Sequence, residues 1–225
     1  MTTETAAPRL EGRAAQRRPG VAVLVVIFTV VEERLQVLLI ERSAAPGEGM
    51  WAIPGGALQH GESLENAAGR KLAEETGVTD LFLEQLYTFG DLDLSSDDGS
   101  VAVAWFALVD QSRVRLAQRT AWRPAWFDLE RVPQLAFSNE QVIAVARERL
   151  INKLQYTDAA YSLLPPRFTM RELQQVYEAI LGRELDKRNF RRRLLATDFI
   201  RQTSESRTDG RHRPARLYRF VNRGS

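Results

Sequence analysis

The sequence predicts an α/β protein of two domains, in which a mixed β-sheet with packed helices (α+β) precedes a small unit of two helices and a β-hairpin. Short apolar runs of strand propensity alternate with amphipathic helical segments over the first two thirds of the chain. Pro165 and Pro166 then interrupt the pattern, because adjacent prolines cannot continue a helix. The net charge changes there as well, from −6 over residues 1–166 to +8 over residues 167–225. The expected divisions are an N-terminal arm over 1–19, one domain over 20–155 and a second over 156–225.

Composition excludes several classes of protein. With 225 residues, 44% of them hydrophobic, the chain can form one large or two modest cores. It has no cysteine, which excludes disulfides, thiolate metal sites and cysteine nucleophiles. The longest apolar run, Val21–Val31, is shorter than the roughly 18 residues of a membrane span, and residues 1–20 lack the apolar segment of a signal peptide. We therefore expect a cytoplasmic protein with no membrane partner.

The first domain begins with a predicted β-hairpin. Val21–Val31 and Leu35–Ile40 are apolar runs of strand propensity that three charged residues separate. A glycine-dense loop over residues 45–61 follows them. This loop leads into a helix predicted over Ser63–Thr76, which Gly77 ends as a C-cap.

Two more strands and a helix complete this domain. The strands are predicted over Leu81–Phe89 and Val101–Val109, with a polar turn between them. Ser138 and Gln141 have the spacing of a capping box, which predicts a helix from there to about Leu154. Together these elements predict a mixed sheet with helices packed on its faces.

The second domain is predicted to be a winged helix-turn-helix. Its two helices should run to Leu181 and to about Thr197, with Thr169 and Asp186 as their capping residues. Residues Ile200–Phe220 contain two strand-like arms around a Thr-Asp-Gly turn, which predicts a hairpin. The order helix, turn, helix, hairpin is typical of winged DNA-binding domains.

A dense motif covers the glycine-rich loop and the first helix. Glycine, glutamate, arginine and a glutamate pair occur at set spacings over 23 residues. This pattern resembles the box of the Nudix family, and the matching positions are Gly56, Glu62, Arg70, Leu72, Glu74, Glu75, Gly77 and Val78. Lys71 departs from the box, which has a glutamate there. The resemblance implies a Nudix mixed-sheet α/β/α sandwich for the first domain.

The box resemblance also implies a site for a divalent cation. In the family, helix glutamates hold Mg²⁺ for the hydrolysis of a diphosphate, and Glu74 and Glu75 match those positions. Lys71 stands in place of a further carboxylate, and its protonated amine can pair with either glutamate but cannot act as a base. We therefore expect no catalytic residue and no required cofactor, and Mg²⁺ at Glu74 and Glu75 stays open. Without the resemblance, these residues describe an ordinary solvated helix face.

Candidate ligands for a small effector are Arg42, Trp51, Gly55, Gly56 and Arg70. Arg42 follows the second strand and could bind a diphosphate through two hydrogen bonds, or be a surface cation. Trp51 could stack on an adenine or belong to the core. The glycines could equally shape a turn, and Arg70 with Glu74 fits an ordinary i,i+4 pair.

The second predicted helix of the C-terminal domain is strongly basic. Phe190 and Leu194 share one face, so Arg188 and Arg192 should point away from the domain. Arginine and asparagine side chains supply the donors that bind phosphates and the edges of guanine and adenine. The predicted DNA-binding residues are Lys187, Arg188, Asn189, Arg191, Arg192, Arg193, Arg211, His212, Arg213 and Arg216.

From about residue 20 onward, the chain resembles the Nudix-related transcriptional regulators of NAD metabolism. The stretches that carry the resemblance are Leu86–Asp91, Leu163–Pro165, Phe168–Thr169, Asn189–Arg192 and Arg213–Tyr218. It implies a homodimeric repressor of NAD-related or sugar metabolism genes that binds a double-stranded DNA operator and is released by a small nucleotide, typically ADP-ribose. After Gly90 and Asp91 the family has an arginine-bearing turn that this chain lacks, which leaves the identity of the effector open.

Two alternative functions belong to other classes. The chain could be an active Nudix pyrophosphatase acting on ADP-ribose or a similar nucleoside diphosphate, with the basic domain as an accessory. It could also be a Nudix enzyme that processes RNA. Mg²⁺-dependent release of AMP would identify the first alternative, and a preference for RNA over duplex DNA the second.

Overall fold

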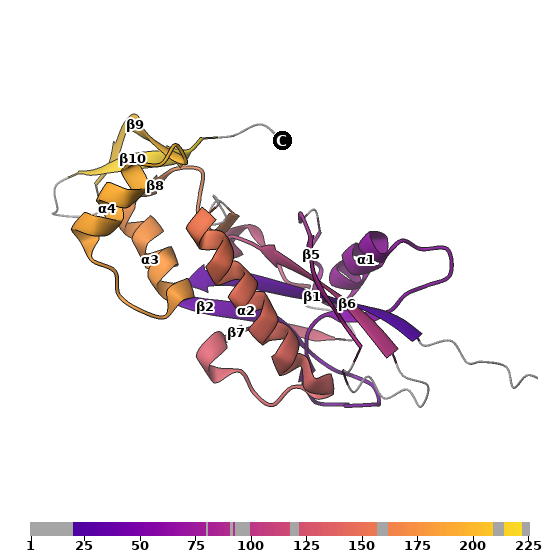
Figure 1. Ribbon diagram of the computed structural model, residues 1–225. Helices are drawn as coiled ribbons and strands as arrows, with labels where there is room; N and C mark the ends of the chain where they lie inside the picture. Colours follow the sequence, from indigo (N-terminus) through magenta and orange to yellow (C-terminus); the bar gives the residue numbers. More distant parts are fainter. Residues whose placement is uncertain are drawn as a thin grey trace, which may run out of the picture.

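The computed structural model describes residues 20–79, 81–90, 92, 100–117, 122–156, 162–208 and 214–221. Figure 1 shows a central sheet with helices beside it and a smaller helical and β-hairpin unit at one end. Among the described residues, no helix is both long and apolar enough to cross a membrane.

The central sheet is mixed and has seven strands. The strands are β1 (Gly20–Val31), β2 (Arg34–Glu41), β3 (Trp51–Ala52), β4 (Gly55–Ala57), β5 (Glu84–Phe89), β6 (Ser100–Leu108) and β7 (Arg123–Asp128). The main order is β3-β2-β1-β6-β5, while β4 pairs with β1 and β7 pairs with β2. β1 is parallel to β6 and antiparallel to β2. The predicted mixed sheet is thereby confirmed.

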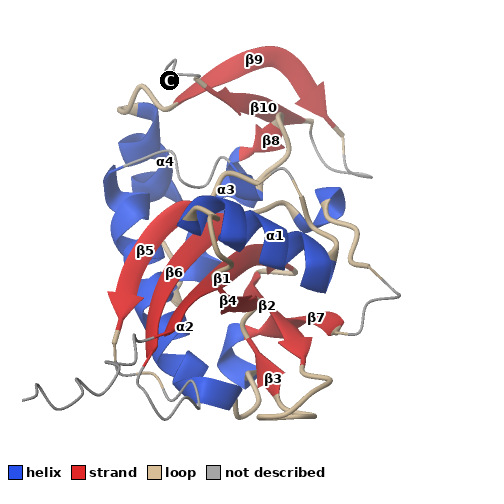
Figure 2. Cartoon of the chain, turned by 90° about the vertical axis from the view of Figure 1, so that its right-hand side faces the viewer, coloured by secondary structure: helices blue, strands red, loops and turns tan. Residues whose placement is uncertain are grey.

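Both faces of the sheet are covered, because residues along β1 alternate between two apolar layers. Val23, Val25 and Ile27 belong to the cluster that includes α1 (Leu64–Thr76). Leu24, Val26 and Phe28 belong to the cluster that includes α2 (Asn139–Tyr156). The helices therefore form layers on opposite faces of the sheet, as Figure 2 shows.

The β1–β2 turn has two central residues in the left-handed region. Glu32 and Glu33 have φ angles of 48° and 62°, and Val31 pairs with Arg34 across the turn. Positive φ at both central residues is the geometry of a type I′ turn, whose twist matches that of the strands. The predicted hairpin is confirmed, with Arg34 in the strand rather than in the turn.

The predicted ends of α1 are confirmed. The Ser63 hydroxyl accepts a hydrogen bond from the Asn66 N–H, and Gly77 ends the helix in the left-handed conformation with φ 77°. Both predicted strands that follow are present, although β5 begins three residues after the expected Leu81.

The predicted capping box at α2 is wrong. Ser138 has a φ of 52°, whereas a capping residue needs an extended backbone. Phe137 before it has a φ of 60°, so the chain enters the helix through two consecutive left-handed residues. Glu140 in the first turn instead accepts a hydrogen bond from the Leu135 N–H at 2.6 Å. The helix itself covers the predicted span and two residues more.

The C-terminal unit has the predicted helices and hairpin in the predicted order, with one short strand before them. These are β8 (Phe168–Thr169), α3 (Met170–Leu181), α4 (Lys187–Leu195), β9 (Ile200–Arg207) and β10 (Ala215–Phe220). Both halves of the α3 capping box are present, Gly182 ends α3, and Asp186 caps α4. α4 ends two residues before the predicted Thr197. The short β8, which the sequence pattern does not predict, completes a three-stranded sheet.

The two domains share one apolar core. Residues of α3, among them Leu173, Val176 and Ile180, belong to the same buried cluster as Phe28 of β1. The Gln175 side chain donates a hydrogen bond of 2.5 Å to the carboxylate of Glu33 in the β1–β2 turn. The winged helix unit is therefore packed against the end of the central sheet that carries this turn (Figure 1).

Candidate functional site

The carboxyl group of Glu75 is buried between α1 and β4. Its side chain is 1% exposed, and Oε2 accepts a hydrogen bond of 2.8 Å from the Gly55 N–H. Only glycine fits at position 55, because a Cβ there would lie 2.3 Å from the Val23 carbonyl oxygen. Burial raises the pKa of Glu75 to about 7, against the opposing effects of the Gly55 hydrogen bond and of the Lys71 charge.

Arg70 is held by acidic residues of its own domain. Its Nε and one terminal nitrogen each donate to Glu62 at 2.8 Å, and the other terminal nitrogen lies 3.3 Å from Glu74. The hydrogen bond from Arg70 lowers the pKa of Glu62. Arg70 therefore ties the glycine-rich loop to the helix, which favours the ion-pair interpretation of this residue.

Lys71 points at the glutamate pair. Its Nζ lies 3.4 Å from Oε2 of Glu74 and 3.5 Å from Oε1 of Glu75. The end of the lysine chain lies against Gly56, where an added Cβ would come within 2.6 Å of Lys71 Cε. The expected pairing of the ammonium with the glutamates is present.

These residues do not fit the divalent cation that the box motif implies. Mg²⁺ needs a set of oxygen ligands, and here an ammonium group lies within ion-pair distance of both candidate carboxylates. Across the described ranges, no group of three or more His, Cys, Asp or Glu residues is arranged to hold a metal ion.

Arg42 lies in an aromatic environment just beyond β2. Its Nε donates to the Pro46 carbonyl at 2.8 Å, and the guanidinium lies 4.6 Å from the centre of the Phe137 ring and 5.6 Å from that of Trp122. Burial lowers the pKa of Arg42, although the charge of Glu75 acts in the opposite direction. Within the described residues its two terminal nitrogens make no hydrogen bond. They are the donors that a bidentate phosphate contact would use.

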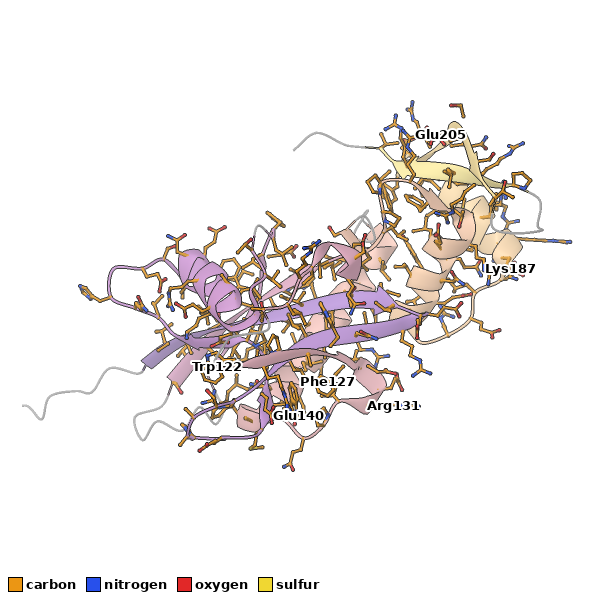
Figure 3. All side chains as sticks on the ribbon, turned by 180° about the vertical axis from the view of Figure 1, so that it is seen from behind. Trp122, Phe127, Arg131, Glu140, Lys187 and Glu205 are labelled. Atoms are coloured by element: carbon orange, nitrogen blue, oxygen red, sulfur yellow. The ribbon has the colours of Figure 1, made fainter. Side chains whose placement is uncertain are left out.

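Trp51 packs at the edge of the core. Its ring meets Phe127 edge to face with centroids 4.5 Å apart, and the Arg123 guanidinium lies 5.8 Å from the Trp51 ring centre. Figure 3 shows Phe127 and Trp122 on the first domain. This packing favours the core alternative for Trp51.

The predicted effector residues fall into two groups, which lie close enough for the charge of Glu75 to act on Arg42. Gly55, Gly56 and Arg70 belong to the box helix and β4, while Arg42 and Trp51 belong to the aromatic group. A cleft of about 720 Å³ at the junction of the two domains and one of about 800 Å³ beside β6 are both lined by other residues.

Several residues of these groups escaped the sequence analysis. Phe137 and Trp122 flank Arg42, and the buried Asn139 accepts a hydrogen bond of 2.8 Å from the Ile53 N–H through Oδ1. The aromatic density between Trp122 and Phe127 was a signal that could have found part of this group. Nothing in the sequence pattern indicates that residues 137–139 return to the strand at Trp51.

The basic residues of α4 face solvent. Phe190 packs on Tyr177 of α3 with ring centroids 5.2 Å apart, and Leu194 is buried, which confirms the predicted inner face of this helix. Arg188 and Arg192 are exposed. The Arg192 guanidinium donates a hydrogen bond of 2.7 Å to the Asn189 side chain.

The other predicted DNA contacts surround this face. Lys187, Asn189, Arg191 and Arg193 are exposed on the same helix, and Figure 3 places Lys187 on the second domain, well away from Trp122. Arg216 is exposed on β10 and donates to the Gln202 side chain at 3.2 Å. The three predicted contacts at the hairpin tip lie outside the described residues: Arg211, His212 and Arg213.

Two family models match the chain and together cover most of it. A model described as the NUDIX domain matches residues 18–146, and one described as the NrtR DNA-binding winged helix domain matches residues 160–220. A curated relative from Acinetobacter baylyi, named ADPR responsive transcriptional repressor NtrR, is 39% identical over 90% of this chain and 82% of its own length.

Solved structures give the same picture for both parts of the chain. The structure of Shewanella oneidensis NrtR complexed with a 27mer DNA matches with a TM-score of 0.77 and 37% identity, over 89% of this chain and 93% of that one. The NUDIX domain of the same Shewanella protein, complexed with ADP ribose, matches with a TM-score of 0.54 and 36% identity, over 63% of this chain and 94% of that one.

Proposed function

This chain belongs to the NrtR family of Nudix-related transcriptional regulators, and on that premise we propose that it represses transcription by binding operator DNA until ADP-ribose binds its Nudix domain. The observation that carries the proposal is the packing of the two parts into one molecule. A Nudix domain with a lysine in its box shares a core with a winged helix whose second helix exposes five basic residues.

The geometry of α4 supports DNA as the partner. Its apolar face is packed on α3, so the helix can enter a major groove without losing its own packing. The Arg192 and Asn189 side chains are already hydrogen-bonded to each other on the exposed face, which reduces the entropy lost when they bind a base edge. The remaining arginines supply phosphate contacts, and operator binding should weaken steeply as salt rises.

ADP-ribose is the effector that the relatives favour. The Shewanella NUDIX domain was solved with ADP ribose, and the Acinetobacter relative is named for its response to ADPR. In this chain the terminal nitrogens of Arg42 and the ammonium of Lys71 are the donors suited to a diphosphate. Aromatic rings beside Arg42 supply a surface on which a base can stack.

We propose that the Nudix domain binds its nucleotide without hydrolysing it. The alternative, an active pyrophosphatase, needs a cation held by the box glutamates, and Lys71 pairs with both of them. Incubation with ADP-ribose and Mg²⁺, followed by chromatography for AMP, should show no product. Release of AMP that Glu75→Gln abolishes would establish the enzyme instead.

The proposed repressor acts as a homodimer. Helix-turn-helix dimers read two half-sites one turn of DNA apart, so two copies of α4 would bind adjacent major grooves. An effector that changes the spacing of the two helices would then weaken operator binding. Light scattering of the free protein should give twice the mass of one 25.5 kDa chain.

The deciding experiment is a fluorescence-anisotropy titration on duplex DNA taken from upstream of the protein's own gene and from neighbouring operons. We expect a duplex that binds far more tightly than a scrambled duplex of the same composition, and release of that duplex when ADP-ribose is added. Specific binding that ignores ADP-ribose would keep the repressor and reject this effector. A preference for single-stranded RNA, or no specific duplex among those tested, would reject the proposal.

A further inference from the structure

The helix α1, which contains most of the Nudix box, carries a positive charge where the family motif requires a metal ligand. The motif places a carboxylate directly after Arg70, and this chain has Lys71 there. That substitution replaces a negative ligand by a positive group. The change does more than remove a ligand, because the new ammonium lies within 3.5 Å of both remaining glutamates.

The residues around Lys71 hold its ammonium group in one place. Gly56 leaves space for the end of the lysine chain, since a Cβ at that position would lie 2.6 Å from Cε and 3.2 Å from Nζ. The Gly55 N–H holds one oxygen of Glu75, which leaves the other oxygen facing Lys71. The strand β4, the helix α1 and its buried Glu75 therefore position the Lys71 ammonium.

The ammonium retains capacity for a further partner. It has three donors, and its distances of 3.4 and 3.5 Å to the glutamates are longer than the 2.7–2.9 Å of a strong charge-assisted hydrogen bond. The Lys71 side chain is 20% exposed, so it is partly accessible from solvent. The two carboxylates hold the cation in place without using all of its donors.

We propose that Lys71 is a built-in cation which takes the place of the divalent metal and binds the diphosphate of ADP-ribose directly. Recognition of the effector is then independent of Mg²⁺. A bound metal would polarise the diphosphate, whereas a lysine ammonium attracts its charge as a donor and brings no activated water with it. This inference rests on the proposed function, because it concerns the same effector at the same domain.

The test is isothermal titration calorimetry of the full chain with ADP-ribose, once in EDTA and once in excess Mg²⁺. The wild-type Kd should agree within about twofold between the two buffers. Lys71→Met keeps a long unbranched side chain but removes its charge, so its Kd in EDTA should rise by roughly 10- to 100-fold, the value of a lost charge-assisted hydrogen bond. Lys153→Met, on α2, removes one lysine charge elsewhere and should leave the Kd unchanged.

A second variant tests the exchange of cation for metal. Lys71→Glu restores three carboxylates on the helix face, so its binding of ADP-ribose should be at least tenfold tighter in Mg²⁺ than in EDTA. Melting curves of both Lys71 variants check that they fold.

The outcomes separate the inference from the proposed function. Loss of wild-type binding in EDTA, an unchanged Kd in Lys71→Met, or Mg²⁺-independent binding in Lys71→Glu would overturn the role of Lys71 while leaving the repressor intact. Failure of the wild type to bind ADP-ribose in either buffer would reject the proposed effector itself.

Discussion

Glu75 links the ionisation of one side chain to the stability of the fold. Because burial raises its pKa from 4.5 to about 7, the folded chain binds this proton more tightly than the unfolded chain does. The stabilisation is complete below about pH 4.5 and is lost as the pH rises through about 7. Glutamine cannot ionise, so Glu75→Gln removes the dependence.

The measurement is urea denaturation of both proteins between about pH 5 and pH 8. Relative to Glu75→Gln, the wild type should lose up to roughly 3 kcal/mol of unfolding free energy over this range. Glu74→Gln, on the same helix but half exposed, controls for the loss of one carboxylate. A difference between wild type and Glu75→Gln that stays constant with pH would contradict the burial argument.

A second prediction at the level of a single residue concerns Arg192 and DNA binding. Arg192→Ala removes an exposed guanidinium from α4, so operator affinity should fall by roughly 10- to 100-fold while the melting temperature stays the same. Arg131→Ala removes an exposed arginine from the first domain and serves as the control. Anisotropy titrations that place both variants at wild-type affinity would show that this helix face does not contact DNA.

Some side-chain contacts could be predicted from the sequence, and others could not. The pairing of Lys71 with the glutamates could be predicted because helical spacing alone brings the three residues together. The attachment of Arg70 to Glu62 could not, since the loop that returns Glu62 to the helix has no fixed period. For the same reason, the rings around Arg42 come from segments about 80 and 95 residues away in the sequence and were missed.

At the scale of elements, two sequence motifs of the same kind have different outcomes. The spacing at Thr169 and that at Ser138 both predict a capping box, but only the first forms one. Thr169→Ala should therefore lower the unfolding free energy by about 1 kcal/mol. Ser138→Ala should change it by less than about 0.5 kcal/mol, as for a surface site without a cap. Chemical denaturation of both variants measures this, and equal losses would mean that Ser138 caps α2 after all.

The length of an element largely decides whether it can be predicted from the sequence. β1, β2, α1 and α3 are long enough for a period of two or 3.6 to be visible, and their ends carry capping or turn residues. β3, β4 and β8 have two or three residues each, too few to show any period. These short strands form because neighbouring strands offer backbone N–H and C=O groups to pair with. They therefore depend on the tertiary structure and not on the local sequence.

At the scale of the whole molecule, the shared core predicts how the chain unfolds. Leu173, Val176 and Ile180 of α3 lose buried neighbours if the first domain unfolds, and Phe28 loses them if the second does. Differential scanning calorimetry should therefore show one transition, with calorimetric and van't Hoff enthalpies that agree. Two resolved transitions would mean that the interface contributes little to either domain.

The placement of β2 has a mechanical consequence. At one end it meets the turn that binds Gln175 of α3, and at the other it leads into Arg42. Strands flank both of its edges, and Val37, Leu38, Leu39 and Ile40 are buried, so a slip of one residue would turn every side chain to the wrong face. The strand therefore cannot slide along its neighbours. A displacement of the loop at Arg42 that reached the second domain through β2 would have to move the strand as one rigid unit, with its register unchanged.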